Sequence, residues 1–382
     1  MMKYRLGEIC DVVSGGTPSR ATAEFWDGGT IPWIKIGNIQ RKYVDEADEY
    51  ITQAGLEGSS AKMLSAGTIL FTIFATLGEV GILTIEACTN QAIAGITIKN
   101  QSDILTDYLY YFLKSQKSCI AALGRGVAQN NINLSILRNF EVPIPDLPMQ
   151  KQIVAILDKT AKVVEVRQQQ LQQLDELVKA RFVELFGDGN HPHIALIDLI
   201  IEGAGLSYGI VQPGDDGTGD MGVLRPVDMV DGKISTASIK YIDRSIGDGF
   251  KKTELYGDEL LITVRGTTGI TALTDIRFNG MNVTRGIAVV RYDRNKINPV
   301  YLNAYLNTDE SQRYIQEHTR GATLQQINLS DLRVQQIMVP PLALQEQMAA
   351  FIEQTDKSKS VVQKALDEAQ LLFDSLMQQY FG

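Results

Sequence analysis

The sequence predicts a mixed α/β protein in which two pseudo-symmetric globular domains are separated by a pair of long antiparallel coiled-coil helices. Three features of the 382 residues predict this fold. The chain contains an internal repeat, each copy ends in a long segment free of glycine and proline, and short β-rich runs separated by turn residues fill the rest. The hydrophobic fraction of 44% and charged fraction of 21% are typical of a folded globular chain.

The repeat relates two halves of nearly equal length. The string RGVAQNNINLSILR at 125–138 recurs as RGATLQQINLSDLR at 320–333, which is an offset of 195 residues. The same offset relates Gln150 to Gln345 and Gln152 to Gln347. Upstream the match weakens and the offset drifts, as in the pairs Asn90 with Asn282 at 192 and Lys35 with Arg225 at 190. The copies are 1–187 and 188–382, and we divide them into domains at 1–147 and 188–342 and helices at 148–187 and 343–382.

The end of each copy predicts a long helix. In the first copy a heptad seam runs from Ile153 to Leu185 in alternating steps of four and three, with polar interruptions such as Arg167. In the second copy a matching seam runs from Met348 to Tyr380 and includes Lys359. Helices of about 37 residues would each be ~55 Å long. We expect the seams to pack on each other in antiparallel fashion; the alternative is that each helix packs onto its own domain.

The globular parts predict strands and a helix in the same order. Strands are expected at 68–75, 80–85 and 92–99 in the first copy and at 259–265 and 286–292 in the second. A helix is expected at 105–123 and again at 299–318, where Asn298 and Pro299 resemble an N-cap followed by proline at the first helical position.

Composition and motifs exclude several classes of function. An excess of 45 acidic over 36 basic residues argues against a polybasic nucleic-acid binder. The three scattered cysteines, Cys10, Cys88 and Cys119, indicate a reducing compartment, no disulfide scaffold and no thiolate metal site. No signal peptide or membrane span is expected, so we predict a cytoplasmic protein of a prokaryote. Motifs for nucleotide hydrolysis, zinc proteases or serine hydrolases are not found, and the string NPVY at 298–301 is an incomplete amino-methyltransferase motif.

With these catalytic motifs excluded, the remaining candidates are polar residues that could recognise a partner molecule. Arg125 and Arg320 each open a polar stretch that contains Gln129 and Asn130 in the first copy and Gln325 in the second. Arginine can pair with guanine, and asparagine or glutamine with adenine, in the major groove of DNA. Asn133 and Asn328, in the matched INLS strings, are better explained as helix caps.

These strings resemble a known family, the specificity subunits of type I restriction–modification systems. The similarity is carried by DVVSGGTPSRATAEFWDGGTIPWIKIGNI at 11–39, by the turns TLGE at 76–79 and TTG at 267–269, and by the proline-led helix starts at 143–158 and 339–353. The string ARFVELFGD at 180–188 adds to it. The second domain lacks the SGGTPS string and has Val223 where the first has Trp33.

The resemblance implies a non-catalytic DNA-recognition subunit. Each globular domain would be a target-recognition domain that reads one half of a bipartite, asymmetric site in double-stranded DNA, and the helices would set the spacing. Two modification subunits would dock, bind S-adenosylmethionine and methylate adenine, and restriction subunits would cut DNA with ATP and Mg. This chain would hold no metal or cofactor itself.

We predict DNA contacts at polar positions in both domains. In the first domain they are Lys35, Asn38, Arg41, Arg125, Gln129 and Asn130; in the second they are Arg225, Arg265, Arg285, Arg320 and Gln325. Some would bind phosphates and orient the domain without reading sequence. Because residues 1–150 carry 12 basic and 15 acidic groups and 188–339 carry 15 and 19, the isolated chain should bind DNA weakly.

Other functions remain open at this point. The chain could belong to a related system that cuts on both sides of its bipartite site (type IIB-like), or to a solitary system. A self-contained adenine methyltransferase is disfavoured because the cofactor loop is missing. A pure coiled-coil scaffold is disfavoured because most of each copy is globular.

Overall fold

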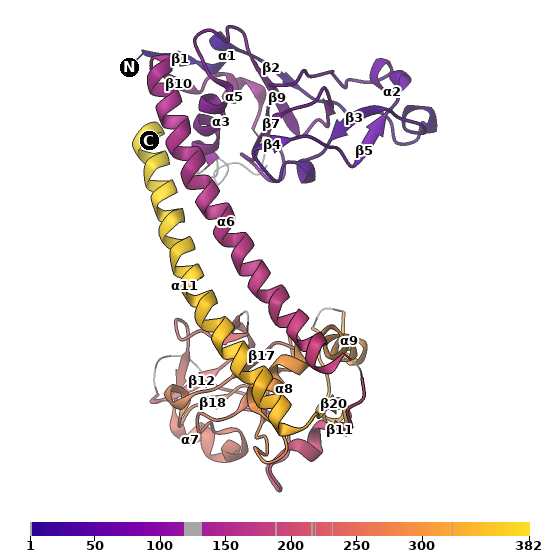
Figure 1. Cartoon of the computed structure of the whole chain (residues 1–382), viewed down its shortest axis with the longest axis vertical. Helices are drawn as coiled ribbons and strands as arrows, with labels where there is room; N and C mark the ends of the chain where they lie inside the picture. Colours follow the sequence, from indigo (N-terminus) through magenta and orange to yellow (C-terminus); the bar gives the residue numbers. More distant parts are fainter. Residues whose placement is uncertain are drawn as a thin grey trace. The chain divides into compact units, whose positions relative to one another are not determined.

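The chain forms two compact units that share both long helices (Figure 1). The computed structural model describes residues 2–117, 132–187, 189–214, 217, 219–230, 232–322 and 324–382. One unit comprises Met1–Gln169 with Gln363–Gly382, and the other comprises Gln170–Val362. The division of the chain into the four segments predicted from sequence stays a prediction, since each unit takes part of each long helix.

The first unit is built on a five-stranded sheet of order β2-β9-β6-β7-β4, accompanied by a three-stranded sheet β5-β3-β8 and a pair β1-β10. Its strands are β1 (Met2–Arg5), β2 (Cys10–Ser14), β3 (Ile31–Ile34), β4 (Tyr43–Val44), β5 (Glu49–Ile51), β6 (Ile69–Thr72), β7 (Val80–Leu83), β8 (Cys88–Thr89), β9 (Ile93–Ile98) and β10 (Glu141–Ile144). Its short helices are α1 (Leu6–Ile9), α2 (Gln53–Glu57), α3 (Thr106–Ser115) and α5 (Leu134–Arg138).

The second unit has sheets β17-β16-β19 and β15-β12-β18 and pairs β11-β20 and β13-β14. Its strands are β11 (His193–Ala195), β12 (Met221–Leu224), β13 (Met229–Val230), β14 (Lys233–Ile234), β15 (Lys240–Ile242), β16 (Leu260–Thr263), β17 (Thr271–Leu273), β18 (Asn282–Val283), β19 (Ile287–Val290) and β20 (Gln336–Met338). Its helices are α7 (Arg244–Gly247), α8 (Pro299–Leu306), α9 (Asp309–His318) and α10 (Leu329–Val334).

A fully buried central strand divides the core of each unit. In β6, Ile69 and Phe71 belong to the cluster on the helix side, whereas Leu70 belongs to the cluster under the three-stranded sheet. In β16, Leu260 and Ile262 likewise face one cluster and Leu261 the other. Alternate side chains of a strand point to opposite faces, so a strand covered on both faces is apolar throughout. The mixed α/β fold and the repeated domain plan predicted from sequence are therefore confirmed.

The repeat is also visible in matched hydrogen bonds. The hydroxyl of Tyr108 donates to the carbonyl of Pro143 (2.6 Å), and that of Tyr301 donates to the carbonyl of Met338 (2.9 Å). The guanidinium of Arg138 donates to the carbonyl of Val12 (2.7 Å). The corresponding bond in the other copy runs from Arg333 to the carbonyl of Leu206 (2.9 Å).

Strand register corrects the alignment upstream of that region. Trp33 pairs with Cys88 in the first unit, and Val223 pairs with Asn282 in the second. Since Trp33 and Val223 correspond, Cys88 rather than Asn90 is the counterpart of Asn282, and the pairing of Asn90 with Asn282 was wrong. The sequence alignment matched Asn90 to Asn282 only because both are asparagines. The backbone hydrogen-bond ladders instead relate Cys88 to Asn282, which is an offset of 194 residues.

The structure breaks one predicted helix into two. The expected helix at 299–318 is α8 followed by α9, with Thr308 as the N-cap of the second: its hydroxyl accepts a bond from the Ser311 N–H (3.3 Å). A threonine that caps the next turn competes with continuation of the helix. Asn298 caps α8 as predicted, accepting from the Val300 N–H (2.9 Å). The helix predicted at 105–123 begins as α3, and part of its predicted range lies outside the described residues.

The long helices α6 (Leu147–Phe186) and α11 (Leu342–Phe381) have 40 residues each. Every seam position from Ile153 to Leu185 and from Met348 to Tyr380 is buried or partly buried. In the first unit, Ile153 and Leu157 of α6 share a core with residues of α11, and in Figure 1 the end of α11 lies beside the first part of α6. The C-terminal residues that enter this core are Phe373, Met377 and Phe381.

The second unit reverses the roles of the two helices. Phe186 near the end of α6 and Met348 near the start of α11 enter its core. Lys359 of α11 forms an ion pair with Asp175 of α6 (2.6 Å). The helices are antiparallel within each unit, and they pack on both domains as well as on each other. No helix in the described part of the chain is long and apolar enough to cross a membrane.

A buried glutamine near the start of each long helix holds the loop before α3 in the first unit and the loop before α8 in the second. The Leu105 N–H donates to Oε1 of Gln150 (2.9 Å), whose Nε2 donates to the carbonyls of Asp103 (2.8 Å) and Pro145 (2.9 Å). Gln345 repeats this arrangement: Oε1 accepts from the Asn298 N–H (2.8 Å) and Nε2 donates to the Pro340 carbonyl (2.7 Å). Both side chains are fully buried.

We predict that Gln150→Ala lowers the free energy of unfolding by about 3 kcal/mol, because several buried backbone groups lose their partner. Gln345→Ala should have a similar effect. The matched controls are Gln152→Ala and Gln347→Ala, which change exposed glutamines two residues further along and should cost under ~0.5 kcal/mol. Thermal and urea unfolding of the full chain measure this; equal melting of the buried-site and control variants would contradict it.

Candidate nucleic-acid interface

The predicted contact residues fall into two groups within the described residues. Arg125, Gln129 and Asn130 lie outside those residues. In the first domain Lys35, Asn38 and Arg41 lie in or beside a 3₁₀ turn (Ile36–Asn38) that follows β3. In the second domain one arginine occupies the equivalent turn, and four residues come from the ends of three adjacent backbone segments.

Lys35 lies in a compact network of charges. Its amine forms an ion pair with Glu49 (2.5 Å), and Arg20 forms a second ion pair with the same carboxylate. The Arg20 guanidinium lies 3.7 Å from the ring centroid of Trp26, which meets Trp33 edge-on. The hydrogen bond from Lys35 lowers the pKa of Glu49; burial opposes this effect, and the hydrogen bond and charge of Arg20 add to it. Lys35 is therefore an oriented cation and not a freely moving one.

The side chain of Asn38 stabilises the 3₁₀ turn. Its side-chain oxygen accepts a bond from the Lys35 backbone N–H (2.9 Å), which closes the 3₁₀ turn. Arg41, by contrast, is largely exposed and makes only long ion pairs, to Asp45 (3.6 Å) and Glu46 (3.4 Å). Exposed pairs of this kind contribute little to stability, so the Arg41 side chain can leave them for a phosphate at small cost.

Arg225 occupies the position of Lys35 but is held differently. The carboxylate of Asp228, the counterpart of Asn38, accepts from the Arg225 backbone N–H (2.8 Å), from Nε (3.0 Å) and from a terminal nitrogen (2.9 Å). Asp228 is fully buried. A buried carboxylate needs its partner, so the arginine that we predicted as a DNA contact is first of all the counter-charge of Asp228.

The other predicted residues of the second domain lie together, and we call this set the arginine surface: Arg265, Arg285, Arg320 and Gln325. The Val264 N–H bonds to the Gly286 carbonyl (2.7 Å), and the Gly266 N–H bonds to the Gln325 carbonyl (2.9 Å). Arg320 and Gln326 bond to each other through their backbones in both directions (2.8 Å each). Three segments far apart in sequence are thus joined at one end of β16 and β19.

Most of the guanidinium groups of the arginine surface are free to bind a ligand. In the described residues no ion pair joins Arg265 or Arg285 to a carboxylate, and Arg285 is exposed. Arg320 makes only a long ion pair with Asp331 (3.7 Å). Unpaired guanidinium groups on one surface of an acidic chain are suited to bind phosphates or guanine edges.

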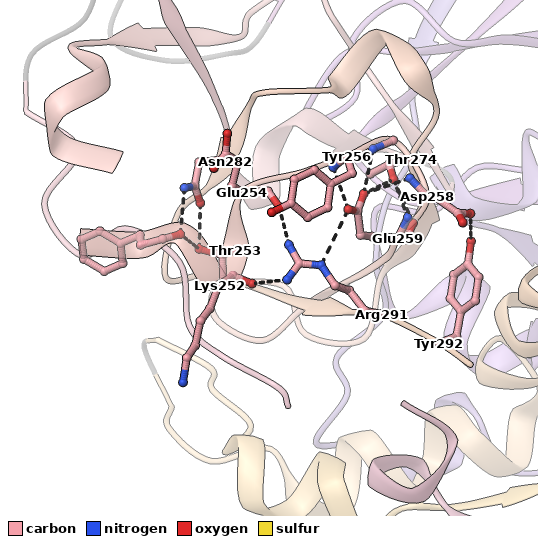
Figure 2. A network of polar contacts seen from close by, with 12 residues as sticks. Lys252, Thr253, Glu254, Tyr256, Asp258, Glu259, Thr274, Asn282, Arg291 and Tyr292 are labelled. Carbon is pink, nitrogen blue, oxygen red and sulfur yellow. Dashed lines mark hydrogen bonds and ion pairs between the residues drawn. The ribbon is translucent and has the colours of Figure 1, made fainter. Parts of the chain in front are cut away.

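A dense polar network in the same domain has a structural role (Figure 2). The buried Glu259 carboxylate accepts from the N–H groups of Tyr256 (2.7 Å) and Gly257 (3.1 Å) and from the Thr274 hydroxyl (2.7 Å). Figure 2 shows Arg291 beside it, 3.9 Å from Glu259 and bonded to the carbonyl of Lys252 (3.0 Å). With these groups occupied, the network ties the loop before β16 to β19 and offers no catalytic carboxylate.

Other candidate chemical groups are inert. Burial raises the pKa of Cys10 to about 12 and that of Cys88 to about 11, so neither is a nucleophile near neutral pH. No cluster of metal-ligating side chains occurs among the residues that the structure describes. Tyr301 of the NPVY string is fully buried, with its hydroxyl bonded to the Met338 carbonyl, and cannot face a substrate.

Comparison with known proteins identifies the family. The family profile "Type I restriction modification DNA specificity domain" matches residues 1–176 and 220–370, one match for each repeat. The chain belongs to this family. It is a DNA-recognition subunit of a restriction–modification complex, in which specificity subunits are not the catalysts.

Named relatives agree. The specificity subunit of the EcoR124I/EcoR124II enzyme of Escherichia coli is 33% identical over 40% of this chain and 39% of its own length. The specificity subunit of the MjaIX enzyme of Methanocaldococcus jannaschii is 22% identical over 91% of this chain and 85% of its own length. The crystal structure of the S subunit from M. genitalium superposes with a TM-score of 0.59 at 15% identity, covering all of this chain and 96% of that one.

A second solved type I chain has the same fold. It was determined in work on complex assembly and conformational transition of a type I system and superposes with a TM-score of 0.56 at 17% identity. It covers all of this chain and 97% of that one. Identities this low show the fold of a specificity subunit and leave the base-reading residues of this one to be argued from its own surface.

Sequence reasoning about this specificity subunit missed Arg20 and Glu49. Arg20 is the last residue of the SGGTPSR string, and Glu49 reaches Lys35 because β5 pairs with β3. The pairing of strands separated by a long loop is not visible in sequence. The role of Asp228 could have been found, since an acidic residue three positions after Arg225 fits a capping pattern.

We predict different outcomes for two arginines of the second domain. Arg225→Ala should lower the free energy of unfolding by about 3 kcal/mol, since it leaves the buried Asp228 carboxylate without its counter-charge. Arg285→Ala, on the exposed arginine surface, should change stability by less than ~0.5 kcal/mol. Urea unfolding of both variants tests this, and similar midpoints for the two would show that Arg225 is not structural.

Proposed function

We propose that each globular domain reads one half of a bipartite, asymmetric site in the major groove of double-stranded DNA. The observation that carries this proposal is that both domains share one backbone plan while the side chains at matched surface positions differ. Lys35 corresponds to Arg225, with different counter-charges, and the arginine surface has no arginine at the position equivalent to Arg265, which is Phe74. Two copies of one scaffold with different side chains suit two different half-sites.

The partners follow from the same duplicated plan. We propose that two modification subunits dock on the long helices, bind S-adenosylmethionine and methylate adenine, and that restriction subunits using ATP and Mg complete the complex. Exposed apolar side chains support two equivalent docking surfaces: Val166 of α6 corresponds to Val361 of α11, and Leu177 to Leu372. Their exposed fractions are 36%, 71%, 49% and 53%. These repeat-related positions are the ones that we propose the two modification subunits cover.

The charge of the chain fits a dependence on partners. Cations in the first domain are partly offset by carboxylates, as Glu49 offsets one of the two charges of Lys35 and Arg20, so fewer charges remain to displace counterions from DNA. The subunit would bind DNA weakly alone and tightly in the complex, in the cytoplasm of a prokaryote. A related type IIB-like or solitary system would use the same surfaces. A self-contained methyltransferase is less favoured because Tyr301 is buried.

The function is tested by reconstitution with labelled S-adenosylmethionine. The chain alone should transfer no methyl groups to DNA, and addition of a cognate modification subunit should produce methylation at one bipartite sequence. Methylation by the chain alone would refute the assignment. A modification subunit without this chain is the control for background activity.

The helices are proposed to fix the unread gap between half-sites. At ~1.5 Å per residue a 40-residue helix is ~60 Å long, which spans two half-sites about one turn of DNA apart. Insertion of one matched heptad in each helix, at Gln170 and at the equivalent Ala365, should widen the gap by ~10 Å, about three base pairs. Sequencing of methylated sites measures the gap; an unchanged gap in an active complex would contradict the proposal.

A further inference from the structure

The antiparallel pairs β6–β9 and β16–β19 each present a cross-strand pair of residues at one end. The last ladder pairs are Thr72 with Ile93 in the first domain and Thr263 with Ile287 in the second. The register continues for one more step, because the Ile73 N–H bonds to the Ala92 carbonyl (2.8 Å) and the Val264 N–H bonds to the Gly286 carbonyl (2.7 Å). The next residues along are therefore opposite each other: Phe74 faces Gln91, and Arg265 faces Arg285.

Phe74 is unusual for its position. It follows β6, in which every residue is buried, yet 40% of Phe74 is exposed to water. Burial of a phenylalanine contributes ~2–3 kcal/mol, and here much of that contribution is forgone. Gln91, opposite it, is also exposed. The fold thus places an apolar and an amide side chain on the surface at the position where the second domain has two arginines.

The backbone holds this pair rigidly. Ala75, next to Phe74, has a φ of 59°, and its counterpart Gly266 has a φ of 88°. Alanine in this left-handed region is strained by ~1 kcal/mol, which glycine avoids. In both domains the threonine that ends the strand closes the turn: Oγ1 of Thr72 accepts from the Glu79 N–H (2.8 Å), as Oγ1 of Thr263 does from the Ile270 N–H (2.9 Å).

Gln91 is held as well. The hydroxyl of Thr17 donates to Oε1 of Gln91, which orients the side-chain amide. The turn hydrogen bond fixes the backbone beside Phe74, and the bond from Thr17 orients the Gln91 amide. Rigid side chains lose little entropy when they bind, which is what discrimination between bases requires.

We infer that Phe74 and Gln91 form a base-reading pair of the first domain, in the place that Arg265 and Arg285 occupy in the second. This inference rests on the proposed function. The pair would read through an apolar contact of Phe74 with a base, most simply a thymine methyl group, and through a hydrogen bond from the Gln91 amide to a base edge. The second domain would read the same place in its half-site through guanidinium groups, which favour guanine.

The experiment uses the full chain in complex with a cognate modification subunit and a DNA library in which both half-sites are randomised. Methylated molecules are sequenced to give a base preference at every position. Phe74→Ala should reduce the preference by about 4-fold at one or two positions of the first half-site, the loss that corresponds to about one methyl contact. The second half-site should be unchanged. Arg265→Ala should give the mirror result, with relaxed preference in the second half-site alone.

Controls separate the possible outcomes. Met63→Ala removes an equally exposed apolar side chain of the first unit (44% exposed) and should leave both half-sites unchanged. Unfolding midpoints establish whether Phe74→Ala is folded. If the alanine variant does not fold, Phe74→Leu, which keeps an apolar contact, takes its place. An unchanged preference with full activity, or a uniform loss of methylation at all sequences, would overturn the inference. Failure of the unmodified complex to methylate any bipartite site would instead refute the proposed function.

Discussion

Neither globular domain completes its core with its own residues, and this constraint shapes the rest of the molecule. The first domain needs Phe373, Met377 and Phe381 from the end of the chain, and the second needs Phe186 from the end of the first copy. Each aromatic anchor packs at an angle against the equivalent tyrosine of the repeat: the ring centroids of Phe381 and Tyr108 are 5.4 Å apart, and those of Phe186 and Tyr301 are 5.3 Å apart. The long helices therefore have a role in stability that is separate from any role as a spacer.

The glutamines at the helix starts complement these anchors. Gln150 joins the start of α6 to the loop before α3, and Gln345 joins the start of α11 to the loop before α8. Each domain is therefore fixed to one long helix by polar contacts and to the other by aromatic contacts. Polar contacts define direction and aromatic contacts supply buried area. A domain held in both ways can change its exposed residues without a change in how it meets the helices.

The sequence predicts what depends on local pattern and fails where distant segments decide. The seams that begin at Ile153 and Met348 were predictable because heptad spacing is a local pattern. Every residue of both seams is buried or partly buried in the structure. The break before Thr308 was missed because one capping threonine outweighed a run of helix-forming residues. The candidate nucleic-acid interface shows the same difference between local pattern and long-range strand pairing. Arg265 and Arg285 could be nominated from residue type, but their approach to Gln325 requires strand pairing, and so does the ion pair of Lys35 with Glu49.

The dependence of the first domain on residues of α11 also has a consequence for biosynthesis. The side chains that complete its core, from Phe373 to Phe381, are made only after the whole second domain, whereas the second domain receives Phe186 before its own strands are made. The first domain is synthesised first, but its core can close only after α11 has been made. A chain cut short within α11 leaves an open apolar core in the first domain, which exposes it to aggregation or proteolysis.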